Sequence, residues 1–257
     1  MSDFFSLEGK VAIITGSSRG IGKTIAKRFT ELGAKVVISS RKIAACKEVE
    51  RQITDMGGKA VSFECNISDK SSCIKLVDFC LETYGTLDVL VCNAASNPYY
   101  GSLEEIPDES FDKIMNNNVK SNLWLCKNVI PHLKKNKSGS IIIVSSIAGL
   151  QGVENLGAYS ISKTADIGLI RSLAVELGPY KINVNGVCPG SIKTDFARAL
   201  WENPEILKEI EEHAPLKRIG TTDEVAGAVI LLASKPGSFI TGQVITMDGG
   251  VTIAGRG

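Results

Sequence analysis

Short apolar runs alternate with longer stretches of helical periodicity along almost the whole chain. A run such as 141–144, Ile-Ile-Ile-Val, is too short for a helix and lacks polar alternation, which is typical of a strand buried on both faces. Between such runs, apolar residues recur every three or four positions, as at Ile21, Ile25, Phe29 and Leu32. The pattern predicts strands at 10–15, 35–40, 59–64, 87–92, 139–145, 182–188 and 243–247, and helices at about 21–32, 42–56, 70–84, 109–134, 158–177 and 222–234.

This alternation predicts an α/β fold with a parallel sheet and helices on both faces, because each crossover helix returns the chain to the same sheet in the same direction. One domain over 1–257 is the simplest interpretation, with a helical excursion near 195–213. Asparagine is a poor helix-interior residue, so Asn116-Asn117-Asn118 predicts a local distortion inside the long fourth helix. We interpret Asn116 and Asn117 as helix-surface residues.

The first predicted strand leads into a glycine-rich turn, Thr15-Gly16-Ser17-Ser18-Arg19-Gly20-Ile21-Gly22. Gly16 permits the turn, Gly20 lets backbone approach a phosphate, and Gly22 lets the next helix pack closely on the sheet. The N-terminus of that helix then directs free N–H groups at a pyrophosphate. A glycine-rich turn alone is weak evidence, but strand, turn and helix together predict a dinucleotide site.

Tyr159 and Lys163 stand four residues apart at the start of a predicted helix, which places both side chains on one helical face. A neighbouring ammonium favours the phenolate, so the pair suits a proton donor. Ser146, just after the strand 139–145, supplies a hydroxyl that can hold a carbonyl oxygen for protonation. Tyrosine and lysine four residues apart are also common on solvated helices. The catalytic interpretation is favoured because the glycine-rich turn at 15–22 independently predicts a nucleotide site.

Polar or turn-forming residues follow several strands, at the edge where open parallel sheets bind ligands. These residues are Arg41, Asn66, Asn93, Ser146 and Pro189. Arg41 stands where NAD-binding sheets usually carry an acidic residue, and Arg19 in the glycine turn supplies a second positive charge. Both would attract the 2′-phosphate of NADPH; the alternative is that both are solvated surface arginines.

Composition and charge exclude several other classes of function. The net charge is +1 with both signs interspersed, which argues against a nucleic-acid partner or an acidic membrane surface. No apolar stretch is long enough for a transmembrane helix, and the first residues lack a signal-peptide pattern. The seven cysteines form no Cys-x-x-Cys and the two histidines are far apart, so we expect no metal site and reduced core thiols. We expect a cytoplasmic protein, since 255–257 is unlike a peroxisomal Ser-Lys-Leu address.

Taken together, the motifs resemble those of the short-chain dehydrogenase/reductase family, in its classical branch, over essentially the whole chain. The resemblance is carried by 15–22, Asn93-Ala94-Ala95, Asn118, Ser146, Tyr159, Lys163, Pro189-Gly190 and Asp248-Gly249-Gly250. Cys92 and Ala95 depart from the family's Asn-Asn-Ala-Gly, which puts any contact needing a positive φ at Ala95 in doubt. Within the family the chain is similar to NADPH-dependent carbonyl reductases of the dehydrogenase/reductase member 4 type, through Ser39-Ser40-Arg41-Lys42, Asn93 to Pro98, Ile192-Lys193-Thr194 and Leu200-Trp201.

The resemblance implies a Rossmann-type doubly wound sheet of seven parallel strands in the order 3-2-1-4-5-6-7. It also implies a homotetramer, with contacts through the long helices near 109–134 and 158–177 and through the apolar segment after 243. Tyr159 would protonate a carbonyl oxygen held by Ser146, and Lys163 would make the phenol more acidic and bind the nicotinamide ribose. The backbone of Asn118 would hold a water linked to Lys163.

The cofactor site implied by the resemblance binds NADP(H). Ile192 and Thr194 would meet its nicotinamide. The full set of implied cofactor residues is Gly16, Ser18, Arg19, Gly20, Ile21, Gly22, Ser40, Arg41, Asn66, Ile67, Asn93, Ala94, Tyr159, Lys163, Pro189, Gly190, Ile192 and Thr194. A role of Ser68 or Asp69 in capping the next helix is an equally good explanation of the region around Asn66.

We therefore expect an NADPH-dependent reductase that acts on a small-molecule ketone or aldehyde. Substrate contacts are expected from Ser146, Tyr159 and a lid over about 191–215 that carries Phe196, Leu200 and Trp201, although that apolar segment could instead be a subunit contact. One alternative substrate is a 3-oxoacyl thioester on a carrier protein, which a basic docking patch beside the pocket would favour. The basic candidates for such a patch are Lys134, Lys135 and Lys137. Another alternative is a non-catalytic nucleotide-binding protein, because a fold alone does not imply a function.

Overall fold

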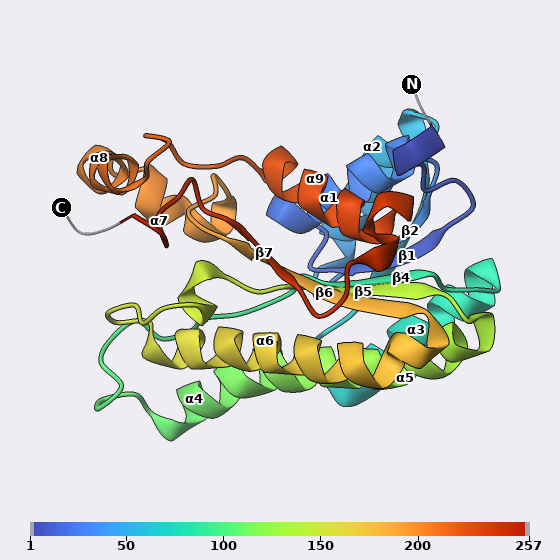
Figure 1. The fold of residues 1–257 in the computed structure, drawn as a ribbon, viewed down its shortest axis with the longest axis horizontal. Coiled ribbons are helices and arrows are strands. Elements are labelled where there is room, and N and C mark those ends of the chain that lie inside the picture. The colour runs from blue at the N-terminus through green and yellow to red at the C-terminus, as the bar shows by residue number, and fades with distance from the viewer. Residues whose placement is uncertain (1–2, 255–257) are drawn as a thin grey trace.

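Seven parallel strands form one twisted sheet in the computed structural model, which describes residues 3–254 (Figure 1). Their order across the sheet is β3-β2-β1-β4-β5-β6-β7, which confirms the predicted fold class and topology. Each strand lies close to its predicted range. The bounds are β1 (Val11–Thr15), β2 (Lys35–Ser40), β3 (Lys59–Glu64), β4 (Val89–Cys92), β5 (Gly139–Val144), β6 (Ile182–Pro189) and β7 (Val244–Met247).

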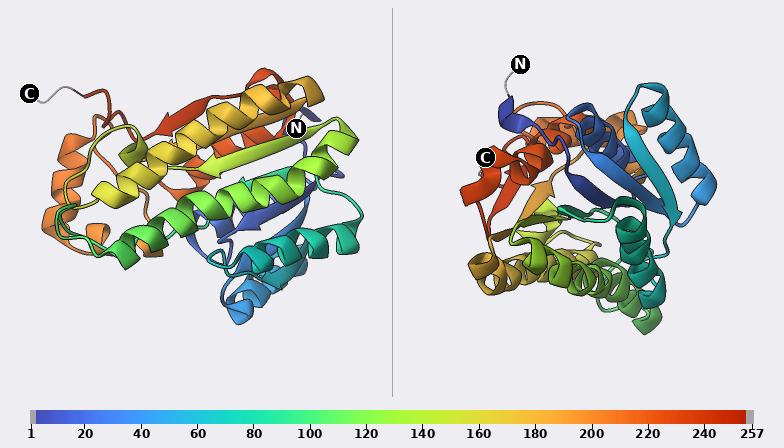
Figure 2. Two further views of the ribbon diagram at one scale, coloured as in Figure 1. Left: turned by 90° about the horizontal axis from the view of Figure 1, so that it is seen from below. Right: turned by 90° about the vertical axis from the view of Figure 1, so that its right-hand side faces the viewer.

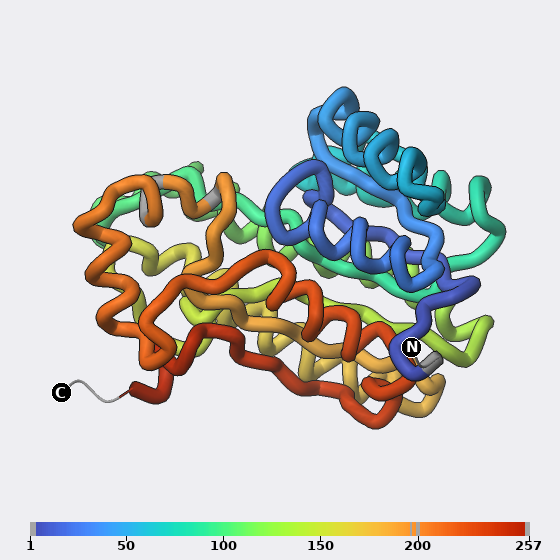
Figure 3. The backbone as a smooth tube through the Cα atoms, turned by 90° about the horizontal axis from the view of Figure 1, so that it is seen from above, coloured from blue at the N-terminus to red at the C-terminus, as the bar shows by residue number. Residues whose placement is uncertain are grey.

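Helices cover both faces of this sheet, as Figures 1 and 2 show. One face carries α1 (Gly20–Glu31), α2 (Ile43–Asp55) and α9 (Thr222–Ala233). The other carries α3 (Lys70–Tyr84), α4 (Asp108–Met115), α5 (Ser121–Asn136) and α6 (Gly157–Leu177). The predicted excursion contains the short α7 (Arg198–Trp201) and α8 (Pro204–His213), which stand beyond one end of the sheet, beside the end of the C-terminal segment (Figure 3).

The strands are continuously apolar because both faces of the sheet are buried. In β1, Ala12 and Ile14 belong to the core formed with α1, α2 and α9, whereas Val11 and Ile13 belong to the core formed with α3, α5 and α6. All four are at most 1% exposed. Burial of each large aliphatic side chain contributes roughly 1.5–3 kcal/mol, so the period-two alternation holds the strand ends in place for the site.

The predicted distortion of the fourth helix is a π-helical turn at Asn116–Lys120, between α4 and α5. The interpretation of Asn117 as a surface residue is wrong, because its side chain is only 3% exposed. Its amide nitrogen donates to Ser96 Oγ at 2.9 Å, and its oxygen accepts from Ser68 Oγ at 2.7 Å. The extra residue in a π turn changes the direction in which side chains point, so the consecutive Asn117 and Asn118 are both buried.

Among residues 3–254, no helix combines the length and the apolar composition that a bilayer span requires.

Candidate active site

A cavity of about 950 Å³ opens at the carboxyl ends of the strands, where the sequence predicted the ligand crevice. It brings together residues that are far apart in the chain, from the glycine turn to the loop after β6. The predicted site residues that line it are Gly16, Ser18, Arg19, Gly20, Ile21, Ser40, Arg41, Ile67, Asn93, Ala94, Ser146, Tyr159, Lys163, Pro189, Gly190, Ile192 and Thr194.

The glycine turn is held in shape by Asn93 and by Thr15. Gly16 and Gly20 have φ values of 65° and 54°, in the left-handed region that favours glycine. Asn93 Nδ2 donates to the carbonyl oxygens of Thr15 at 2.9 Å and Gly16 at 3.2 Å. In return, Thr15 Oγ1 accepts from the backbone N–H groups of Asn93 at 3.0 Å and Ala94 at 3.1 Å. The sequence did not single out Thr15, although it begins the turn motif.

The N-terminus of α1 faces this cavity without a capping side chain. Arg19 occupies the N-cap position in an extended conformation and makes no side-chain cap hydrogen bond. A helix N-terminus of this kind leaves N–H groups available to an anion. A Cβ at Gly20 would lie 3.6 Å from Thr194, an ordinary contact distance, so glycine is favoured here by its positive φ and not by lack of space.

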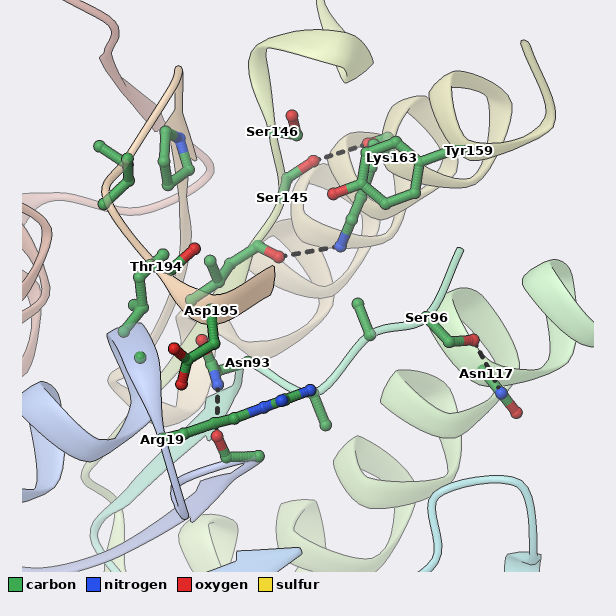
Figure 4. A pocket seen from close by; sticks show the side chains of 18 of the residues that line it. Arg19, Asn93, Ser96, Asn117, Ser145, Ser146, Tyr159, Lys163, Thr194 and Asp195 are labelled. Atoms are coloured by element: carbon green, nitrogen blue, oxygen red, sulfur yellow. Dashed lines mark hydrogen bonds between the residues drawn. The ribbon is translucent and has the colours of Figure 1, made fainter. Parts of the chain in front are cut away.

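Tyr159 and Lys163 project from α6 toward Ser145 and Ser146 at the end of β5 (Figure 4). The Lys163 side chain is only 2% exposed, and its Nζ donates to the Val144 carbonyl oxygen at 3.0 Å. The same Nζ lies 5.7 Å from the centroid of the Tyr159 ring. The three predicted groups, phenol, ammonium and Ser146 hydroxyl, therefore share one wall of the cavity.

Two serines follow β5, and their side chains make different contacts. Ser146 Oγ accepts from the backbone N–H of Ala148 at 3.2 Å, which caps the short 3-10 helix Ile147–Gly149. Ser145, which the sequence did not predict as a site residue, donates from Oγ to the Lys163 carbonyl oxygen at 2.9 Å. This bond joins the strand end directly to the helical turn that carries Tyr159 and Lys163.

Lys163 is paired with a second buried charge, Asp166, at 3.1 Å between Nζ and Oδ2. Burial lowers the pKa of Lys163, but the facing Asp166 and Tyr159 raise it, and the net direction is upward. Lys163 is therefore a cation at neutral pH. The sequence motif gave no signal for Asp166, because the role of this residue depends on a contact one turn beyond the motif.

Asn118 joins a loop to α6 and does not line the cavity. Its side chain is fully buried, its Oδ1 accepts from the Ser96 N–H at 2.9 Å, and its Nδ2 donates to Ser162 Oγ at 3.0 Å. A further donation from Nδ2 reaches the Ser96 carbonyl oxygen at 3.0 Å. The Asn118 side chain thus links the loop at Ser96 to Ser162 on α6. A role of Asn118 in a water relay to Lys163 stays a prediction.

Asn66 and Gly22 lie beside the cavity rather than in its lining. Asn66 is exposed, and its Oδ1 accepts from the Ser68 N–H at 3.2 Å. Asp69 caps α3, as the alternative explanation of this region predicted. At Gly22, a Cβ would lie 2.5 Å from Asn93 Nδ2, so this glycine serves the close packing that the sequence predicted. Direct cofactor contact by these two residues stays a prediction.

Of the three predicted substrate residues in the excursion, only Trp201 has a described side chain. Its Nε1 donates to the Thr194 carbonyl oxygen at 2.8 Å, so the indole stabilises the turn that contains Thr194. Trp201 itself does not line the cavity. The side chains of Phe196 and Leu200 lie outside the described part of the chain. The sequence missed Tyr100, Val153 and Glu154 on irregular loops, where periodicity carries no signal. It also missed Asp195 in the 3-10 helix Asp195–Ala197 and Ile210 on α8.

A family model described as Enoyl-(Acyl carrier protein) reductase matches residues 16–252. The chain is also 41% identical over 247 residues to dehydrogenase/reductase SDR family member 4 of Bos taurus, which covers 95% of this chain and 88% of that protein. The chain belongs to the short-chain dehydrogenase/reductase (SDR) family. Its identity to the Homo sapiens protein of the same name is 38%, with the same coverage, and to tropinone reductase-like 3 of Erythroxylum coca it is 41%, over 95% of this chain and 93% of that protein.

Solved structures of SDR proteins share the fold over nearly the full chain. A 7α-hydroxysteroid dehydrogenase complexed with NADH and 7-oxo glycochenodeoxycholic acid matches with a TM-score of 0.93 at 36% identity, covering 97% of each chain. A Pseudomonas aeruginosa RhlG/NADP active-site complex matches with a TM-score of 0.93 at 33% identity, covering 98% of this chain and all of that one. The protein is thus an SDR oxidoreductase, in a family that acts on alcohol and carbonyl groups with nicotinamide cofactors.

Proposed function

We propose that this SDR protein is an NADPH-dependent reductase of ketones or aldehydes. The observation that carries the proposal is the single cavity, which joins the glycine turn and two arginines at one end to Tyr159, Lys163 and Ser146 at the other. A dinucleotide needs an anion site and a reaction site at separate points, and this cavity provides both. The names of the relatives, which include reductases and dehydrogenases, support the same reaction class.

The residues present fit an NADP(H) molecule. The uncapped N-terminus of α1 and the left-handed Gly16 and Gly20 suit a pyrophosphate. Arg19 and Arg41 line the adenosine end, and within residues 3–254 neither guanidinium has a salt-bridge partner. Strand β2 ends in Ser40, so no acidic side chain stands there to repel a 2′-phosphate. Ile192 and Thr194 would orient the nicotinamide end.

When bound, the cofactor supplies a hydride to the carbonyl carbon. Tyr159 gives its phenolic proton to the carbonyl oxygen, and the Ser146 hydroxyl donates a hydrogen bond to the same oxygen. The buried Lys163 cation stabilises the phenolate that remains. The excursion over 191–215 forms one wall of the cavity through Ile192, Thr194, Asp195 and Ile210, and we propose it as the substrate lid.

A carrier-protein thioester is a less favoured substrate. The expected docking lysines, Lys134, Lys135 and Lys137, lie at the end of α5 and just before the amino end of β5. The cavity opens at the carboxyl end of the same sheet, so these lysines lie at the opposite edge. Lys134 is also placed over the Tyr180 ring, 4.2 Å from its centroid. The basic patch that would favour an acyl-carrier partner is therefore not beside the pocket.

We also propose a cytoplasmic homotetramer with one domain per chain. The seven cysteines are all buried and free, which suits a reducing compartment. Exposed apolar side chains on α6 and near the C-terminus, such as Val175 and Ile253, suit burial against other subunits.

The test is reduction of a panel of ketones, diketones, aldehydes and acyl thioesters, followed through NADPH absorbance. Tyr159→Phe keeps the ring and removes the proton donor, so its turnover is expected to fall by about 10²–10⁴, the scale of general acid catalysis. Binding of NADPH, measured by calorimetry, should be largely retained. Near-normal turnover in purified Tyr159→Phe would remove Tyr159 as the donor, and the absence of any reduced carbonyl would overturn the proposed function.

A further inference from the structure

Asp166 is a buried acid that the proposed reaction does not use. It lies on α6 one turn after Lys163, and its side chain is fully buried. Among the side chains that the structure describes, the buried charged residues are Lys163 and Asp166, at 2% and 0% exposure. Isolated buried charges are costly, so the two side chains must be considered as one unit.

Asp166, which is fully buried and does not line the cavity, holds the Lys163 ammonium. An ammonium has three N–H donors. One reaches Asp166 Oδ2 at 3.1 Å and a second reaches the Val144 carbonyl oxygen at 3.0 Å. The remaining donor is available to the cavity, which Lys163 lines together with Tyr159. The carboxylate and the strand carbonyl therefore determine where the positive charge lies relative to the phenol.

The carboxylate is held in turn by α5. Asn122 Nδ2 donates to Asp166 Oδ1 at 2.9 Å, and the same amide nitrogen donates to the Asn118 carbonyl oxygen at 2.6 Å. Asn122 is 2% exposed, so this link is buried as well. A continuous set of hydrogen bonds thus joins Lys163 through Asp166 and Asn122 to the π-helical turn that contains Asn118.

We propose that Asp166 is a positioning residue, which fixes Lys163 below Tyr159 and offsets part of its positive charge, and so sets the pH at which Tyr159 gives up its proton. This inference rests on the proposed function. A purely structural ion pair would hold α6 together without changing the acidity of the phenol, and that is the difference to be measured.

The charges around the pair support this assignment. Burial raises the pKa of Asp166, and Lys163 and Asn122 lower it only in part. Burial also raises the pKa of Cys188 on β6. The pKa of Cys92 on β4 is raised first by its hydrogen bond with the Cys126 thiol on α5 and then by burial. Cys188 and Cys92 are therefore neutral thiols at neutral pH. The groups that bond to the pair from β5 and α5 are a carbonyl and an amide. Among the described residues, Asp166 is the acid that faces Lys163, with 3.1 Å between Nζ and Oδ2.

The decisive variant is Asp166→Asn, which keeps the shape and removes the charge. Phenolate absorbance is titrated against pH in the purified protein, and the Tyr159→Phe titration is subtracted to isolate Tyr159. With the negative charge gone, the phenolate is expected to form at a pH lower by about half a unit or more, the scale of one charge at short range in an effective dielectric of about 20. The acidic limb of the rate profile for alcohol oxidation should move in the same direction.

Three further variants complete the design. Asp166→Glu keeps the charge and should keep the titration near that of the unmutated protein. Glu176→Gln removes an exposed negative charge from the same helix and should leave it unchanged. Asp166→Ser is the second neutral variant if the amide does not fold, since its hydroxyl can still accept from Lys163. Thermal unfolding checks that each variant is folded.

The outcomes separate the two proposals. A phenolate titration of a folded neutral variant that stays in place overturns the role of Asp166, even if activity falls. A move to higher pH would mean that burial discharges Lys163 once Asp166 is neutral, which still assigns the acidity of the phenol to this pair. The titration needs neither substrate nor turnover, so it remains decisive if no carbonyl compound is reduced. A shifted titration without any reductase activity would overturn the proposed function and leave the Lys163–Asp166 coupling standing.

Discussion

Arg41 and Arg19 are the side chains on which the choice between NADPH and NADH depends in the proposed function. Both line the cavity and both are exposed, so solvent would weaken each contact with a phosphate. We expect a preference for NADPH over NADH of roughly tenfold or more in catalytic efficiency. Arg41→Asp should weaken NADPH selectively and improve NADH, because it adds repulsion against the phosphate and an acceptor for ribose hydroxyls.

Steady-state kinetics with both cofactors checks this prediction. Lys47→Asp is the matched control, since it makes the same charge change on the exposed side of the neighbouring α2 and does not line the cavity. Equal efficiency with the two cofactors in the unmutated protein would mean that both arginines are surface residues.

At the level of residues, the sequence predicts those whose role depends on a local motif. Tyr159 and Lys163 share a helical face by spacing alone, and Gly16 and Gly20 adopt the left-handed φ that a tight turn requires. Thr15, Asn122 and Asp166 were missed because each acts through a partner on another element or beyond the motif. A polar residue at such a position has no distinguishing pattern in one sequence.

At the level of elements, α1 depends on the absence of a side chain at Gly22. A Cβ there would lie 2.5 Å from both Asn93 Nδ2 and the Gly16 carbonyl oxygen. Gly22→Ala is therefore expected to lower the free energy of unfolding by about 1–3 kcal/mol, the usual cost of overpacking. It should also weaken NADPH binding, because Asn93 holds the glycine turn.

Urea unfolding measures the effect, with Gly227→Ala in α9 as its control. No atom lies within 4 Å of a Cβ at Gly227, so that change should raise stability by about 0.5–1 kcal/mol through the better helix propensity of alanine. Similar unfolding free energies for the two variants would show that α1 moves easily to accept the methyl group.

The start of α9 should make stability depend on pH in the acid range. Thr221 and Glu224 form a capping box at this helix start. The pKa of Glu224 is lowered from 4.5 to about 2, first by its hydrogen bond with Arg218 and then by its hydrogen bonds with Thr221. Because the folded pKa is depressed, this contribution is present above about pH 4.5 and is lost as the pH falls toward 2. Glu224→Gln should flatten the fall of the melting temperature in this window.

Melting temperatures across the acid range decide this point. Glu82→Gln, on the exposed face of α3, serves as the control and should keep the slope of the unmutated protein. An unchanged slope in Glu224→Gln would show that the cap contributes nothing that depends on its charge.

Most elements could be predicted because a sheet buried on both faces has continuously apolar strands, and its covering helices show a clear helical periodicity. The distortion at Asn116–Lys120 was predictable from three helix-disfavouring asparagines, but not the direction of their side chains. That direction depends on the π turn, which the intrinsic preferences of the residues do not specify.

At the level of the whole molecule, the outer side of α6 presents an apolar line at Ile161, Gly168 and Val175. The three positions are spaced by seven residues, so they lie on one side of the helix. Ile161 is 42% exposed and Val175 is 80% exposed. We expect light scattering at micromolar concentration to give the mass of a tetramer, and Val175→Glu to reduce it, since a charge would be buried in the contact.

Lys75→Glu on the exposed side of α3 is the control and should leave the mass unchanged. A monomeric mass for the unmutated protein would instead mean that α6 faces solvent in the working enzyme.

The bond from the Trp201 indole to the Thr194 carbonyl oxygen gives the protein an internal optical reporter. The chain has two tryptophans, and the other, Trp124, lies on α5 against the core. Lys193 Nζ lies 5.3 Å from the centroid of the Trp201 ring, so indole fluorescence depends on the conformation of this cavity-lining turn. With Trp124 replaced by phenylalanine, we expect the emission of Trp201 alone to change when nucleotide or substrate enters the cavity, without any attached dye.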